Sequence, residues 1–209
     1  MAPKDDFPIL PFATPAAWET WLEVNHADAA GVWLKIAKAG TGIASITYAQ
    51  ALDGALCYGW IDGQKRAADD TYWLQRFTPR TPRSKWSKVN CHKVEALITD
   101  GRMQAAGSRQ IAMAKADGRW AAAYDSQSTA TVPPDLARAL NASLDARDFF
   151  ATLDSVNRYA ILYRIQDAKK PETRAKRIAS FVEMLTAGRT VYPLKSKTVS
   201  PPPSEPTTG

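Results

Sequence analysis

The chain has few of the residues from which metal sites, disulfide frameworks and thiol-based catalytic centres are built. Its 209 residues include two cysteines and two histidines. Cys57 and Cys91 lack the CxxC spacing of metal-binding and redox motifs. So small a set of ligands disfavours a transition-metal site, and a chain of this length does not need disulfides to fold. We therefore expect no metal and no cofactor.

Long apolar runs and an export signal are also missing. No stretch approaches the length of about 20 apolar residues that crosses a membrane. The opening MAPKDDFPIL contains two aspartates and is broken by prolines, unlike a secretory signal peptide. We expect a cytoplasmic protein without a transmembrane segment. The P-loop, GxGxxG, HExxH and GxSxG motifs are absent too. No reaction is assigned, and a non-enzymatic role is favoured while catalysis is left open.

Acidic residues are missing from one segment of the chain. Between Thr71 and Val94 there are six cations and no carboxylate. The net charge of this segment therefore equals the net charge of +6 of the whole sequence. Its cations are Arg76, Arg80, Arg83, Lys85, Lys88 and Lys93. A local positive field of this kind attracts phosphates, nucleic acid, acidic lipid or acidic protein. The alternative interpretation is that these charges form only a solvated surface and bind no partner.

Apolar residues make up 45% of the chain, and their spacing predicts an α+β fold. The segment TYAQALDGALC has helical periodicity, and Thr47 and Gln50 form a capping box at its start. GVWLKIAK alternates as a strand does, and WIDGQKRA and TYWLQRF read as a hairpin. We predict a small, mostly antiparallel sheet packed with helices, followed by an all-helical C-terminal half.

The same patterns predict three regions along the chain. Residues 1–82 form an N-terminal α/β part with the small sheet. Residues 83–188 form a helical part that ends in a helical pair, with helices expected at about 84–99 and 104–116. The remaining residues, 189–209, are rich in proline and poor in apolar side chains, so they are expected to be a disordered tail.

Four blocks of sequence carry a resemblance to a known family. They are ALCYGWIDG, RFTPRTPRSKWSKVN, GRMQAAGSRQIAMAKADGRW and AKKPETRAKRIASFVEML. In this order they resemble the bacterial YdeI/OmpD-associated family, also called bacteriocin-protection proteins, over about residues 12–188. The resemblance implies a role in antimicrobial peptide resistance, bacteriocin protection or the stress response. It implies no agreed enzymatic activity, cofactor or catalytic residues.

The basic block is the first candidate site. A helix that starts at Ser84 or at Thr81 would turn its unpaired N–H groups toward neighbouring cations, an arrangement that suits anions. Trp86 would then stack on a ligand, or alternatively pack in the core. Asp62 and Gln64 in GWIDGQ would point to one side of a strand and line a polar pocket, or Asp62 would pair with an arginine of RFTPR. The candidate ligand-binding residues are Arg76, Arg80, Arg83, Lys85, Trp86, Lys88, Asp62 and Gln64.

Three functions remain open from the sequence. The favoured one is a protein that binds an anionic partner or polyanion through the basic block. The first alternative is a binding protein or enzyme for a phosphorylated or carboxylated small molecule, with a pocket between the GWIDGQ strand and the basic loop. The second alternative is a module that binds a protein partner through the C-terminal helical pair. Cys57 has no histidine placed beside it by the sequence, so thiol catalysis is disfavoured.

Overall fold

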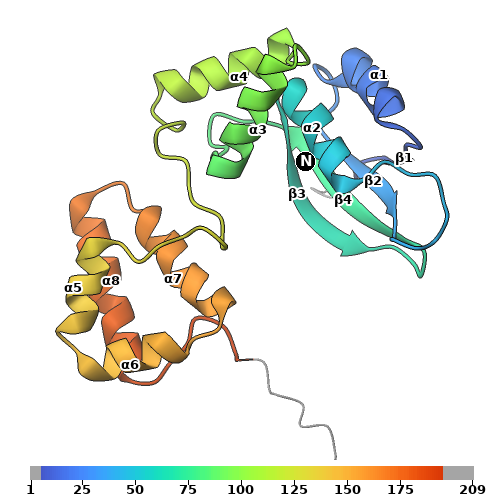
Figure 1. The fold of residues 1–209 in the computed structure, drawn as a ribbon. Coiled ribbons are helices and arrows are strands. Elements are labelled where there is room, and N and C mark those ends of the chain that lie inside the picture. Colours follow the sequence, from blue (N-terminus) through green and yellow to red (C-terminus); the bar gives the residue numbers. More distant parts are fainter. Residues whose placement is uncertain (1–5, 195–209) are drawn as a thin grey trace, which may run out of the picture. The chain divides into compact units, whose positions relative to one another are not determined.

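The computed structural model describes residues 6–194, which fold into two compact units, with the division in the sequence between Tyr124 and Asp125 (Figure 1). Within the described residues, the N-terminal unit holds a four-stranded sheet and four helices, and the C-terminal unit holds four helices. The predicted α+β class with a helical C-terminal half is confirmed. None of the helices found between residues 6 and 194 has the length and apolar character needed to span a bilayer.

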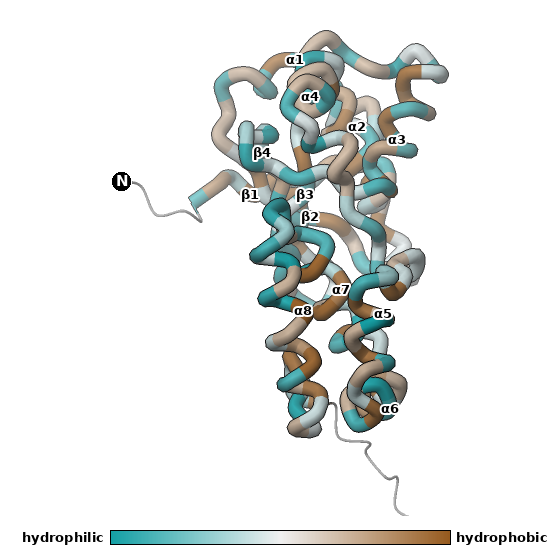
Figure 2. The backbone as a smooth tube through the Cα atoms, turned by 90° about the vertical axis from the view of Figure 1, so that its left-hand side faces the viewer, coloured by the Kyte–Doolittle hydropathy of each residue, from teal (hydrophilic) through white to brown (hydrophobic). Residues whose placement is uncertain are grey.

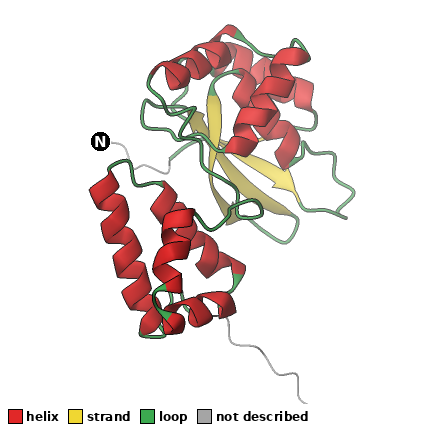
Figure 3. Cartoon of the chain, turned by 60° about the vertical axis from the view of Figure 1, so that its left-hand side comes forward, coloured by secondary structure: helices red, strands yellow, loops and turns green. Residues whose placement is uncertain are grey.

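The N-terminal unit is built on a mixed sheet. Its elements are β1 (Ile9–Pro11), α1 (Pro15–Asn25), β2 (Val32–Ala37), α2 (Tyr48–Cys57), β3 (Trp60–Ala67), β4 (Tyr72–Pro79), α3 (Lys88–Thr99) and α4 (Ala105–Ala116). The strand order is β1-β2-β4-β3, with β1 parallel to β2 and the other pairs antiparallel. The predicted hairpin is β3–β4. The helices of this unit lie on the same side of the sheet (Figure 3).

The main core lies between this sheet and its helices. Alternation in β2 turns Val32, Leu34 and Ile36 toward the helices, and Phe77 of β4, which pairs with Val32, joins them in the core. Trp18 of α1 is fully buried against them, and its indole Nε1 donates to the Ala51 carbonyl at 3.0 Å. All seven tryptophans of the chain belong to this unit. Their large rings supply much of its buried apolar area.

Local sequence signals set the ends of these helices. The Thr14 side chain caps α1, and Thr47 and Gln50 form both bonds of the predicted capping box of α2. Gly101 and Gly118 follow α3 and α4 with φ of 69° and 79°, the left-handed conformation that glycine adopts most easily. These two turns correspond to the DGRM and DGRW sequences.

The start of α3 differs from the prediction. The helix begins at Lys88 and is capped by Ser87, whose hydroxyl accepts from the Asn90 N–H at 3.1 Å. Neither Ser84 nor Thr81 is the cap. The reason is a long-range contact: the Trp86 carbonyl accepts from the Tyr124 N–H at 3.0 Å and a parallel bridge joins Ser87 to Tyr124. This pairing holds the residues before Lys88 extended.

The C-terminal unit is a separate helical bundle. Its helices are α5 (Pro134–Asn141), α6 (Leu144–Thr152), α7 (Ser155–Gln166) and α8 (Pro171–Thr186). The core contains Leu136, Phe150, Ile161, Ile165 and Leu185. Apolar and polar stretches alternate along these helices in Figure 2, as expected where each helix buries one face.

The boundary between the units differs from the sequence-based division after residue 82. Helices α3 and α4 belong to the N-terminal unit, because both pack on α2. Residues 189–194, the start of the predicted tail, are described by the structure and contact the C-terminal unit. Val191 packs on the C-terminal core, and the Tyr192 N–H donates to Asn157 Oδ1 at 2.8 Å. The prediction for residues 195–209 lies outside the described residues.

Candidate functional site

Arg80 is the most unusual side chain of the basic block. It follows β4, is 5% exposed, and its guanidinium lies 3.6 Å from the centroid of the Trp86 ring. Its Nη1 donates to the Lys85 carbonyl at 3.1 Å, which closes the loop between them. The buried Nε and Nη2 atoms have no hydrogen-bond partner among the described residues. Such unsatisfied buried donors are rare in proteins, because each costs a large desolvation energy.

A second arginine, from a distant segment, supports the same loop. Arg119 of the DGRW turn donates from Nη1 to the Ser84 carbonyl at 2.9 Å, and its Nε bonds to Asp117. Trp120 beside it packs on Trp86, with 5.0 Å between ring centroids. Trp86 is thus held between a guanidinium and a second indole. The core interpretation of Trp86 agrees with its exposure of 2%, although its partner is Trp120 and not the exposed Val89.

A small pocket lies where the start of β3 meets the end of β4. It has a volume of about 140 Å³. Its charged and polar lining residues are His26, Tyr58, Arg80, Arg109 and Gln110, and none of the described residues that line it is acidic. We call it the arginine pocket. The pocket predicted from the sequence was lined by Asp62 and Gln64, and neither residue lines the arginine pocket. His26, which caps the end of α1, and Arg109 of α4 come from distant segments and were not predicted.

The chemistry of the arginine pocket suits an anion. Burial lowers the pKa of Arg80 to about 10, with Asp62 acting in the opposite direction, so the group stays charged at neutral pH but is poorly solvated. Arg109 is exposed and makes no ion pair with any described residue. Burial, with help from Glu23 and Glu19, raises the pKa of Tyr58, so its hydroxyl remains a neutral donor. The pocket therefore offers donors and positive charge.

The GWIDGQ strand arranges its polar residues differently from the prediction. The register of β3 shifts between Asp62 and Lys65, so simple alternation does not apply to Asp62 and Gln64. Asp62 accepts a hydrogen bond of 2.9 Å from the Tyr48 hydroxyl, and Gln64 is exposed. Arg76 lies against Gly63, where an added Cβ would come 2.9 Å from its Nε. An arginine of the chain itself therefore occupies the space that a side chain at position 63 would need.

The remaining cations of the basic block differ in their exposure. Arg83, Lys85 and Lys88 are exposed, whereas Arg76 is half-buried. Lys93 forms an ion pair with Asp53, with 2.7 Å between Nζ and Oδ1. The structure thus separates the predicted set: Arg80 and Trp86 are internal, and three cations line the surface.

The two cysteines are free and buried. Burial raises the pKa of Cys57 to about 11, which keeps its thiol protonated at neutral pH and makes it a poor nucleophile. His26 instead closes α1, because its Nδ1 lies 2.9 Å from the Leu22 carbonyl. Between residues 6 and 194, no three histidine, cysteine or acidic side chains come together as a metal site would require.

In the C-terminal unit the basic AKKPETRAKR motif has a structural role. Arg174 of α8 forms a two-fold ion pair with Asp135 of α5, at 2.6 and 2.9 Å, and also donates to the Ile165 carbonyl at 3.0 Å. Arg177 donates to the Arg164 carbonyl. Both acceptors are at the end of α7, where helix carbonyls lack partners within the helix. The two arginines therefore fasten α8 to α7 and α5.

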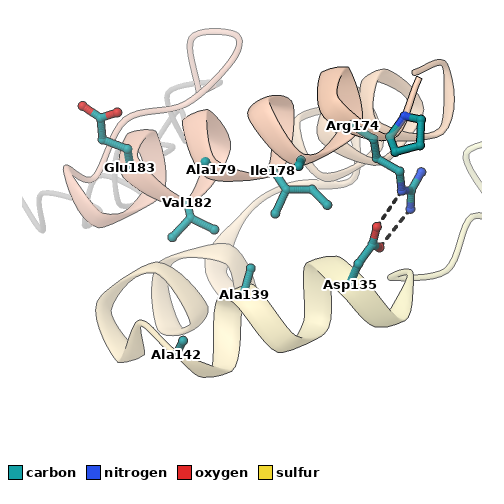
Figure 4. Close-up of a pocket in the computed structure, with 10 residues that line it drawn as sticks. Asp135, Ala139, Ala142, Arg174, Ile178, Ala179, Val182 and Glu183 are labelled. Carbon is teal, nitrogen blue, oxygen red and sulfur yellow. Dashed lines mark hydrogen bonds and ion pairs between the residues drawn. The ribbon is translucent and has the colours of Figure 1, made fainter. Parts of the chain in front are cut away.

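An apolar groove runs between α5 and α8 (Figure 4). Its volume is about 720 Å³. Ala139 on α5 and Ile178 and Val182 on α8 point into it, and the Asp135–Arg174 pair closes one end. The protein-interaction hypothesis named the helical pair α7 and α8, of which only α8 lines this groove.

Removing Arg174 should destabilise the C-terminal unit. Arg174→Ala deletes a bidentate, partly buried ion pair and a helix-end hydrogen bond, for which we expect a loss of about 2 kcal/mol. Urea unfolding followed by far-UV circular dichroism measures it, and Lys176→Ala, which removes an exposed charge from the same helix, is the matched control. Equal stability of the two variants would contradict a structural role for Arg174.

The same ion pair gives this unit a dependence on pH. The hydrogen bonds from Arg174 hold the pKa of Asp135 below its usual value of 3.8. A carboxyl with a depressed folded-state pKa adds stability above its unfolded pKa, and the contribution is lost as the pH falls through the folded pKa. We expect acid below about pH 4 to weaken the wild type more than Asp135→Asn, as read from urea midpoints at pH 3 and pH 6.

Comparison with known proteins assigns the two parts of the chain separately. Residues 129–188 match the family described as bacteriocin-protection, YdeI or OmpD-associated. Residues 10–110 match a domain of unknown function, DUF8412. No curated protein and no solved structure matches the chain. The C-terminal helices are therefore similar to the bacteriocin-protection, YdeI or OmpD-associated family, and the resemblance predicted over about residues 12–188 is confirmed for residues 129–188.

Proposed function

We propose that the N-terminal unit binds a small anion, phosphorylated or carboxylated, in the arginine pocket. The observation that carries this proposal is Arg80: a guanidinium 5% exposed, with two nitrogens that lack acceptors and no ion pair among the described residues. Buried charges in proteins are normally paired. An anion would supply the missing acceptor and the missing charge together.

The size of the pocket limits the ligand. A volume of about 140 Å³ is small beside the 300–1,000 Å³, roughly, of sites for drug-sized molecules. It suits inorganic phosphate, a small carboxylate or the charged end of a longer molecule. Arg109, on α4, would provide a second charge from the open side of the pocket.

A polyanion surface receives less support from the geometry. That hypothesis needs the cations of the basic block together on the outside, but Arg80 is turned inward and Arg76 lies against Gly63. The exposed Arg83, Lys85 and Lys88 are the part of the block that such a partner would contact. A bacteriocin-protection role stays a proposal for the whole protein, supported by the match over residues 129–188. A part in the stress response and a cytoplasmic location also stay proposals.

Anion binding is tested by thermal shift and calorimetry with inorganic phosphate, glycerol 3-phosphate and succinate at low salt. We expect at least one of them to bind, and Arg109→Gln to weaken it about ten-fold, since a hydrogen bond to a charged group contributes about 1.5–3 kcal/mol. Arg109 is exposed, so its replacement should leave the fold intact.

Arg83→Gln is the matched control, because it removes an exposed arginine of the basic block that does not line the pocket. It should leave small-anion binding unchanged. If instead Arg83→Gln weakens heparin binding while Arg109→Gln changes nothing with any ligand, the polyanion hypothesis replaces ours. A lack of binding by all three small anions contradicts the proposal.

A further inference from the structure

A second candidate site surrounds Trp73, at the far end of the sheet from the arginine pocket along β4. Two adjacent hollows of about 330 and 370 Å³ share Trp73 and Lys38 in their linings. The first is bounded by the loop between β2 and α2, and the second by the end of β3, including Lys65. We call the two together the Trp73 hollow. Each is large enough for a small organic ligand.

The pairing of the strands explains why this place is open. Trp73 lies opposite Ile36 of β2 and Ala67 of β3, on the helix-covered side of the sheet. Ala67 has only a methyl group, so the neighbour paired with Trp73 on β3 is small. The Tyr48 ring approaches from α2, with 6.3 Å between the centroids of Tyr48 and Trp73, and its hydroxyl is fixed by Asp62. The aromatic surface is therefore held in place before any ligand binds.

The charge around the hollow is positive. Lys65 pairs with Gln75, two residues from Trp73, so strand alternation puts it on the same side of the sheet. Lys38 continues β2, with its N–H donating to the Thr71 carbonyl at 2.8 Å. Neither lysine side chain makes an ion pair or hydrogen bond within residues 6–194. No acidic residue is among the described residues that line either hollow.

From this arrangement we propose that the Trp73 hollow binds a nucleoside phosphate, either free or as part of a single strand, with its base on Trp73 and its phosphate on Lys38 and Lys65. A tryptophan face accepts any base, because every base has a π-face. Lysine ammonium groups bind phosphate as point charges. The site is distinct from the arginine pocket, whose volume is too small for a nucleotide, and it does not rest on the function proposed for that pocket.

Calorimetry at low salt with AMP, with a four-residue thymidine strand and with adenosine tests the proposal. Either AMP or the strand should bind, and the one that binds identifies the source of the ligand. Trp73→Ala should weaken binding at least ten-fold, in line with the loss of one base–aromatic stack, and Trp73→Phe should restore most of it. Lys38→Gln/Lys65→Gln should weaken AMP or strand binding several-fold and reduce its salt dependence.

The controls separate this site from the arginine pocket. Lys38 and Lys65 are exposed, so the double variant remains informative if Trp73→Ala fails to fold. Arg109→Gln should leave AMP and strand binding unchanged. Binding that Arg109→Gln abolishes and the lysine variant does not would overturn the assignment. So would adenosine binding as tightly as AMP, or the absence of binding by both AMP and the strand.

Discussion

Replacing Trp86 with alanine is expected to destabilise the N-terminal unit by about 4 kcal/mol, the cost typical of deleting a buried tryptophan ring. Trp86 is 2% exposed and lies between the Arg80 guanidinium and the Trp120 ring. Its loss would open a cavity and would also leave the buried Arg80 charge without its aromatic neighbour. Both effects act on the folded state in the same direction.

The distribution of tryptophans allows the stability of the N-terminal unit to be measured separately. Because all seven lie in the N-terminal unit, tryptophan fluorescence during urea unfolding reports that unit alone. Val89→Ala is the matched control: Val89 lies three residues away but is 45% exposed, so its truncation should change stability by less than about 0.5 kcal/mol. Trp86→Phe should be intermediate. A loss below about 1 kcal/mol for Trp86→Ala would show that the ring is not the centre of this loop.

The elements that sequence patterns predicted well are those determined by neighbouring residues. The capping box of Thr47 and Gln50 acts over three positions, and the alternation of β2 acts over two. The left-handed glycines of the DGRM and DGRW turns are likewise local features, since helix ends are stabilised by contacts within one turn. These features are determined by residues that are close to one another in the sequence.

The candidate site was harder to predict because it depends on distant contacts. Arg119 reaches the Ser84 carbonyl across 35 positions, and Tyr124 fixes the backbone of Trp86, which moved the start of α3 from the predicted Ser84 to Lys88. A run of cations in a sequence also gives no sign of which one is buried. Tertiary packing buries Arg80 and leaves Arg83 exposed. As a result, Arg80 lines a pocket and Arg83 lies on the surface.

The sequence of the basic motif near the C-terminus also does not reveal whether its cations bind a ligand or stabilise the fold. Charge alone permits AKKPETRAKR to be a binding face. The structure uses Arg174 and Arg177 as donors to helix-end carbonyls and to Asp135. The basic composition of this motif therefore serves folding, and Arg174 and Ala175 of the motif also line the apolar groove.

Gly107→Ala is expected to destabilise the N-terminal unit by about 3 kcal/mol, the upper part of the usual range for overpacking. Gly107 lies in α4 where this helix touches the end of α2. An added Cβ would come 2.4 Å from the Cys57 carbonyl oxygen and 2.7 Å from that of Leu56. These are backbone atoms, so a side-chain rotation cannot relieve the clash. The helix would have to move, and the bond from the Gln104 N–H to the Cys57 carbonyl, 3.2 Å long, would be strained.

The direction of this effect is diagnostic, because helix propensity acts against it. In a helix interior, alanine is more favourable than glycine by about 1 kcal/mol, so Gly107→Ala would be stabilising if α4 were not pressed against α2. Ser108→Ala, at the exposed neighbouring position, supplies the propensity change without the clash and should be neutral or slightly stabilising. Fluorescence-monitored urea unfolding of both variants gives the comparison. Because α4 also carries Arg109 and Gln110 into the arginine pocket, Gly107→Ala should weaken anion binding as well, whereas Ser108→Ala should leave it intact.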